Sequence, residues 1–198
     1  FCDVWGVIHN GRRAFQGACD ALVKARQSGV PVVLITNAPV AALHVESVFE
    51  PVGVPKAAYD AIASSGDATR AELFARTPGP AYRLGTDEGW EKDDTLFEDV
   101  GLEFLPDEKA SEAAFIIAMG LRDQFNDHPD DYKDELTALA EKKIPFICAN
   151  PDIQVRVGNN LMWCAGALAR IYERAGGPVI YPGKPFPPIY DLARTLMV

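Results

Sequence analysis

FCDVWGVIHNG, at residues 1–11, opens with two apolar residues that lead directly into a carboxylate, Asp3. A second apolar run, VPVVLIT at 30–36, follows a stretch at 17–28 in which alanine and leucine recur at helical spacing. Gly29 is placed to end that helix. Because buried strand patterns alternate with helical patterns, we predict an α/β fold built on a parallel sheet.

The alternation continues along the rest of the chain. Further strands are expected near 60–63, 81–85, 102–105, 113–120, 144–149 and 178–181. Helices are expected near 40–50, 67–76, 130–143 and 165–175, with a last helix after the final strand. Turn-rich stretches, RTPGPAY at 76–82 and GNNL at 158–161, are expected to border an inserted module in which Trp90 and Trp163 pack.

Polar side chains follow the first, second and last predicted strands. Asp3 and Trp5 come after the first strand, Thr36 and Asn37 after the second, and Lys184 after the last. Open α/β sheets bind ligands at the carboxyl ends of their strands, so we expect these residues to converge. A carboxylate nucleophile, a hydroxyl donor and a lysine cation together suit phosphoryl chemistry.

The motifs resemble those of the haloacid dehalogenase superfamily, and specifically its class IIA, NagD-like branch. The resemblance rests on DVWGVIHNG (3–11), VVLITNAP (32–39), CANPD (148–152), AGALARIYERAGG (165–177) and YPGKPFPPIYDLA (181–193). It covers nearly the whole chain, in the order that the family has. It implies a Rossmann-like core, formed by residues 1–78 and 163–198, with an inserted α/β cap of the C2 type at 79–162.

The resemblance also implies roles for the polar residues. Asp3 matches the family's nucleophile, and Lys184 matches the lysine that offsets the phosphate charge during catalysis. Thr36 would bind the phosphoryl group, and Asn37 would support it there. Each position also has a plain structural interpretation, as a turn former, a helix cap or a solvated lysine.

A metal site and a substrate pocket are implied in the same way. The Asp3 carboxylate and the main-chain carbonyl of Trp5 match the ligands of a Mg2+ ion. Asn150 and Asp152 match a cap motif beside the substrate, although they could instead only shape the turn at Pro151.

Trp5 departs from the family pattern, because the phosphatases of the branch have an aspartate there as general acid and base. Such help is worth about 10²–10⁴-fold in rate, and an indole cannot supply it. His9 is an alternative proton donor. A phosphometabolite-binding protein with weakened catalysis, or a dehalogenase-type hydrolase, are the alternatives to a Mg2+-dependent phosphatase of a small phosphorylated metabolite.

The remaining expectations come from composition and from the ends of the sequence. The net charge of −9, without a Lys/Arg run, argues against nucleic acid as a partner. No apolar stretch approaches the ~20 residues of a membrane span. Four cysteines without metal or redox spacing suit free thiols in a reducing, cytoplasmic setting. We expect the sequence to be truncated at both ends, before the family's fourth motif with its acidic metal ligands. The resemblance also suggests a homodimer.

Overall fold

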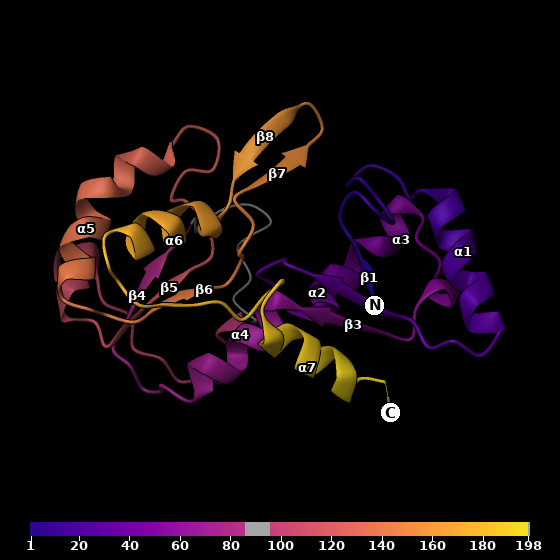
Figure 1. Ribbon diagram of the computed structural model, residues 1–198, viewed down its shortest axis with the longest axis horizontal. Helices are drawn as coiled ribbons and strands as arrows, with labels where there is room; N and C mark the ends of the chain where they lie inside the picture. Colours follow the sequence, from indigo (N-terminus) through magenta and orange to yellow (C-terminus); the bar gives the residue numbers. More distant parts are fainter. Residues whose placement is uncertain (86–95, 198) are drawn as a thin grey trace.

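The computed structural model describes residues 1–85 and 96–197, which form two lobes (Figure 1). The first lobe contains a three-stranded parallel sheet in the order β1-β2-β3. Its strands are β1 (Cys2–Asp3), β2 (Val33–Thr36) and β3 (Ala61–Ser64). Asp3 lies opposite Ile35 in the register, so the carboxyl ends of β1 and β2 are nearly level.

Helices cover both faces of this sheet. They are α1 (Gln16–Gln27), α2 (Ala42–Ser47), α3 (Phe49–Val52), η1 (Lys56–Ala58), α4 (Ser65–Phe74) and α7 (Pro187–Thr195). Successive strand residues point to opposite faces. Leu34 therefore packs in a cluster with Phe49, whereas Val33 and Ile35 pack with Ile189 of α7 on the other face.

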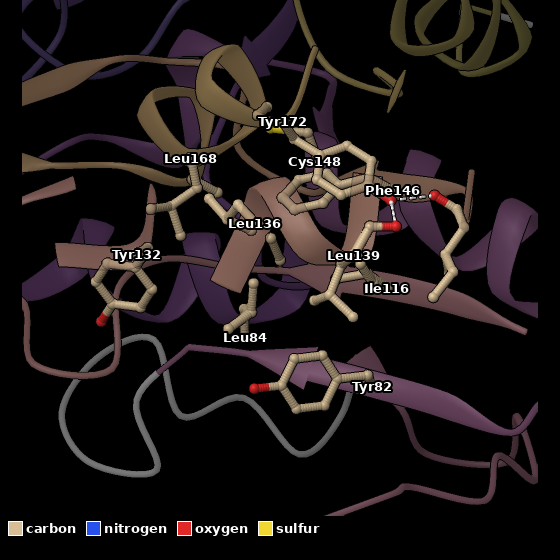
Figure 2. Packing of buried hydrophobic residues seen from close by; sticks show 14 of the residues in the cluster. Tyr82, Leu84, Ile116, Tyr132, Leu136, Leu139, Phe146, Cys148, Leu168 and Tyr172 are labelled. Carbon is tan, nitrogen blue, oxygen red and sulfur yellow. Dashed lines mark hydrogen bonds between the residues drawn. The ribbon is translucent and has the colours of Figure 1, made fainter. Parts of the chain in front are cut away.

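The second lobe contains a four-stranded parallel sheet in the order β4-β5-β6-β9. Its strands are β4 (Ala81–Leu84), β5 (Phe115–Ala118), β6 (Phe146–Cys148) and β9 (Val179–Ile180). The helices α5 (Lys133–Glu141) and α6 (Ala165–Arg174) cover one face, where Leu136, Phe146, Leu168 and Tyr172 are fully buried (Figure 2). The lobe also holds two 3-10 helices, η3 (Asp107–Glu112) and η4 (Pro129–Tyr132).

A separate hairpin, β7 (Gln154–Val157) with β8 (Asn160–Trp163), leaves the second lobe beside the loop that follows β1 (Figure 1). The stretch 158–161, expected to border the inserted module, instead spans its turn, with Gly158 at φ +63. Both strands are half exposed and contribute few buried side chains, so they lack the apolar run that identifies the other strands.

The α/β class with parallel sheets is confirmed. A strand expected near 102–105 is wrong, because this stretch contributes a single bridge between Ala81 and Phe104. Residues 163–180, expected with the core, pack with the second sheet as α6 and β9. We therefore propose that the cap extends to about residue 180, beyond the expected boundary at 162. Trp90 lies outside the described residues.

All four cysteines, which lie in the described part, are free thiols, as expected. Within 1–85 and 96–197, no helix has the length and apolar character needed to cross a membrane.

Candidate active site

An ion pair between the two ends of the chain marks the candidate site. Lys184 Nζ contacts Asp3 Oδ1 and also donates a hydrogen bond to the main-chain oxygen of Ile35 at 3.1 Å. Asp3 ends β1, whereas Lys184 follows β9 of the other lobe. The Asp3 side chain remains 44% exposed, so a ligand can reach the carboxylate that the lysine holds.

Asn37 fixes the main chain of Lys184 with both ends of its amide. Its Oδ1 accepts from the Lys184 N–H at 2.7 Å, and its Nδ2 donates to the Lys184 carbonyl at 3.2 Å. Nδ2 also donates to Asp152 Oδ1 at 2.9 Å. Both amide protons of this buried side chain therefore have protein acceptors. The Asn37 side chain therefore positions Lys184 and Asp152, and it has no donor left over for a phosphoryl group.

Thr36 lies at the end of β2, buried beside these groups. Its Oγ1 accepts a hydrogen bond from the main-chain N–H of Ala38 at 3.2 Å. The hydroxyl proton is directed to no acceptor among the described residues. A buried hydroxyl with an unused proton can donate to an oxyanion.

Gly183 allows the lysine loop to approach the core closely. A Cβ at this position would lie 2.5 Å from Ser65 Oγ, 2.7 Å from Asn37 Oδ1 and 2.7 Å from Pro151 Cδ. Ser65 Oγ itself donates to the carbonyl of Ala149 at 2.5 Å, which ties α4 to the end of β6. The sequence reasoning missed Ser65, whose stretch SSGDATR indicates only a helix start.

Trp5 follows the nucleophile position in a tight loop. The Gly6 N–H donates to the His9 carbonyl at 2.8 Å, and Gly6 has φ +77. The Trp5 ring meets the His9 ring edge-on, with 5.4 Å between centroids, and its Nε1 donates to the Arg156 carbonyl of β7 at 2.9 Å. The indole therefore binds the hairpin and brings no ionisable group to Asp3.

His9 is a buried side chain, packed between the rings of Trp5 and Phe49. Its Nδ1 accepts a hydrogen bond from the Gly11 N–H at 3.0 Å. Burial lowers the pKa of His9, so the ring is neutral near pH 7. These features favour a structural role for His9 over the alternative of a replacement proton donor.

The two cap residues differ in their surroundings. Asn150 is buried, and its Oδ1 accepts from the Asp152 N–H at 3.1 Å, which shapes the turn around Pro151. Asp152 is exposed and contacts Asn37. The structure therefore brings Asp152 to the site and gives the Asn150 side chain a turn-forming contact.

Cys2 adjoins the nucleophile position, and its Sγ donates to the Asp3 carbonyl at 3.3 Å. Burial, followed by the nearby Asp3 charge, raises the pKa of the Cys2 thiol. A protonated thiol is a weak nucleophile, so Asp3 has no competitor from its neighbour.

The oxygens around Asp3 fit a hard divalent cation. Lys184 occupies Asp3 Oδ1, whereas Asp3 Oδ2 and the Trp5 main-chain carbonyl accept no hydrogen bond from the residues that the structure describes. Mg2+ commonly takes one or two carboxylates and completes its shell with waters and phosphate oxygens. Two free oxygens fit such an ion, although the described ranges contain no cluster of three or more acidic, His or Cys ligands.

Comparison with known proteins identifies the family of the chain. The model of the haloacid dehalogenase-like hydrolases matches residues 1–103. A haloacid dehalogenase-like hydrolase from Brucella suis 1330 is 40% identical with a TM-score of 0.89, over 99% of this chain and 70% of that one. The chain belongs to the haloacid dehalogenase-like hydrolase family.

Further solved structures place it among the NagD-like, class IIA members of this family, as the motifs predicted. NagD from E. coli K-12 is 26% identical with a TM-score of 0.65, over 99% of this chain and 73% of that one. A glycerol phosphate phosphatase from Mycobacterium tuberculosis, solved in complex with calcium, shares the fold at 18% identity and a TM-score of 0.69. It is matched over 99% of this chain and 56% of its own. No curated protein sequence gives a match.

Proposed function

We propose that this haloacid dehalogenase-like hydrolase cleaves small phosphoric monoesters through a covalent intermediate on Asp3. The observation that carries the proposal is the contact between Lys184 Nζ and Asp3 Oδ1 at the carboxyl ends of β1 and β2. A carboxylate held beside a cation suits attack on an anionic phosphoryl group, because the cation offsets the charge between nucleophile and substrate. The phosphatases among its structural neighbours support the same reaction class.

The proposed reaction has two displacements. An Asp3 carboxylate oxygen attacks phosphorus, the bond to the ester oxygen breaks, and an aspartyl-phosphate remains. Water then attacks this phosphorus, which releases inorganic phosphate and restores Asp3. Lys184 stabilises the equatorial oxygens in both steps, and the Thr36 hydroxyl donates a hydrogen bond to one of them. Asn37 keeps Lys184 in place through its main chain.

Magnesium is the proposed cofactor. Asp3 and the Trp5 carbonyl would hold it. When bound, the ion would offset charge on the nucleophile and on the phosphoryl oxygens. Asp152, at the cap end of the site, is proposed to border the substrate.

The indole at Trp5 favours a second candidate, a protein that binds phosphoryl groups and turns them over weakly. Without the general acid, the ester oxygen leaves as an unprotonated anion. The missing help corresponds to about 10²–10⁴-fold in rate. Esters of acidic alcohols, such as p-nitrophenol, depend least on that help.

The deciding experiment compares hydrolysis of p-nitrophenyl phosphate by the wild-type protein and its Asp3→Asn variant, with Mg2+ and with a chelator. We expect metal-dependent turnover that the variant loses. Binding of orthovanadate without turnover in the wild type would support the second candidate. Turnover retained by Asp3→Asn would overturn the covalent mechanism. Release of halide from a haloacid without added metal would indicate the dehalogenase alternative.

A further inference from the structure

We propose that Trp5 is a positioning residue whose indole N–H fastens the β7–β8 hairpin of the cap beside the Asp3–Lys184 site. The inference deepens the proposed function, on which its kinetic test rests, and it also has a test independent of turnover. The observation that starts it is the hydrogen bond from Trp5 Nε1 to the Arg156 carbonyl, at 2.9 Å, between residues far apart in sequence.

The core side of this contact is fixed by the loop that carries it. The Val7 and Ile8 N–H groups both donate to the Val4 carbonyl, at 3.3 and 3.0 Å, and so hold the backbone around Trp5. The indole lies over Gly11, where an added Cβ would come within 2.6 Å of Cη2. The ring therefore rests on its own loop and points its N–H outward to the cap.

The cap side is an exposed strand with an unused edge. Among the described residues β7 pairs with β8 alone, so its other edge presents main-chain groups without a strand partner. The Arg156 carbonyl accepts the indole proton. A short, half-exposed hairpin has few packing contacts of its own, and a bond to the core therefore has a large influence on where it lies.

Two neighbouring contacts act in the same direction. The Arg12 guanidinium lies against the hairpin turn, where a Cβ at Gly158 would come within 2.9 Å of Nη2. At the base of the hairpin, Asp152 accepts from Asn37 at 2.9 Å. The hairpin is thus tied to the core at its base, along β7 and at its turn.

An aspartate at position 5 could not make this contact. Its side chain is shorter and, when ionised, has no proton to donate to a carbonyl. With Trp at position 5, the chain thus has a group that holds the cap where an aspartate would supply a group that transfers a proton. We infer that the fastened hairpin limits the size of the ester that enters, because a bulky substrate must break the Trp5–Arg156 bond.

The test without turnover measures solvent exchange of the indole N–H groups in the full chain labelled with 15N-tryptophan. The chain has three tryptophans, so Trp5→Phe and Trp163→Phe assign the Trp5 and Trp163 signals by their disappearance. The Trp163 indole, which has no acceptor among the described residues, is the internal reference. We expect the Trp5 proton to exchange more slowly than that of Trp163, and Arg12→Ala to accelerate it about 2- to 10-fold, as expected for a weakened hydrogen bond. Equal rates for Trp5 and Trp163 in the wild type would overturn the proposal.

The kinetic test compares kcat/KM for a bulky and a small phosphate ester. Trp5→Phe keeps an aromatic ring and the main-chain carbonyl but lacks the N–H, so we expect the bulky-to-small ratio to rise about 2- to 10-fold. Trp163→Phe makes a similar change on the same hairpin, at a ring that contacts His128. An unchanged ratio in Trp5→Phe, or an equal rise in Trp163→Phe, contradicts the proposal. If no variant turns over any ester, the proposed function fails, and the exchange measurement still decides the role of Trp5.

Discussion

Asn37 holds the main chain of Lys184: its side-chain amide accepts from the Lys184 N–H at 2.7 Å and donates to the Lys184 carbonyl at 3.2 Å. The lysine of the site is therefore positioned by a residue that follows β2, while its ammonium group is left to contact Asp3. Because Asn37 also donates to Asp152, a single amide joins β2, the lysine loop and the cap.

Asn37→Ala is expected to lower stability by about 1–3 kcal/mol, because it leaves partly buried main-chain groups of Lys184 without their partner. Thermal or urea unfolding would measure this loss. Phosphate affinity should fall with it, as the lysine loop loses its support. Asn159→Ala, at an exposed residue of the hairpin turn, is the matched control and should change neither quantity.

Gly183→Ala is expected to displace the lysine loop. The new methyl group would meet Ser65 Oγ at 2.5 Å and Asn37 Oδ1 at 2.7 Å, and such overpacking costs about 1–3 kcal/mol. The measurement is unfolding together with turnover of p-nitrophenyl phosphate. Gly17→Ala, in α1 with open space around its Cβ, should be neutral or slightly stabilising. Equal effects of the two substitutions would show that the close approach at Gly183 is unimportant.

Stability is expected to fall as the pH is lowered below about 6.5, the pKa of histidine in an unfolded chain. Burial lowers the pKa of His9 in the folded state, so between the two pKa values the unfolded state binds more protons and is favoured. The contribution is fully present above pH 6.5 and declines until the pH passes the folded pKa. Urea unfolding at several pH values measures this slope.

His9→Asn should flatten that slope, because an amide oxygen can still accept from Gly11 but does not titrate in this range. His44→Asn is the control. Carboxylates with a lowered pKa, such as Asp60 and Glu46, contribute their own loss of stability at more acidic pH. If the dependence of unfolding free energy on pH is unchanged in His9→Asn, a group other than His9 causes it.

The wild-type rate is expected to depend strongly on the leaving group, because Trp5 cannot protonate it. An alkyl phosphate should be hydrolysed far more slowly than p-nitrophenyl phosphate. Trp5→Asp should narrow this gap, by up to about 10²–10⁴-fold if the new carboxyl adopts the general-acid role. Steady-state kinetics on a series of esters would measure it. Trp5→Phe loses the same indole N–H without gaining a carboxyl, so it separates proton transfer from the hairpin contact.

The convergence of Asp3 and Thr36 could be predicted because the parallel strands β1 and β2 share their carboxyl edge. Lys184 also reaches this edge, but it comes from the loop after β9, which pairs with β6 in the second sheet. β2 gives the clearest signal, because its continuous apolar run is buried throughout. The family resemblance added their proposed roles. The parallel α/β architecture was predictable for the same reason.

Other features depend on contacts between distant segments, which a single sequence does not contain. The hairpin was missed because β7 and β8 are half exposed and show no strong apolar run. The apolar pattern of β9 predicts a strand, but it does not indicate whether this strand pairs with β6 or with the first sheet. The bond between Trp5 and Arg156 involves a main-chain carbonyl, which no residue type identifies.

The path of the chain from β9 to Lys184 couples the cap to the charge of the site. Val179 pairs with Phe146 inside the cap sheet, and the chain then runs directly to the lysine loop. The ammonium group is thus carried by the loop that follows a cap strand, whereas the carboxylate it meets belongs to the core. A substitution in the hydrophobic interior of the cap that loosens β9 should therefore lower the affinity for phosphate first, although it lies far from any ligand.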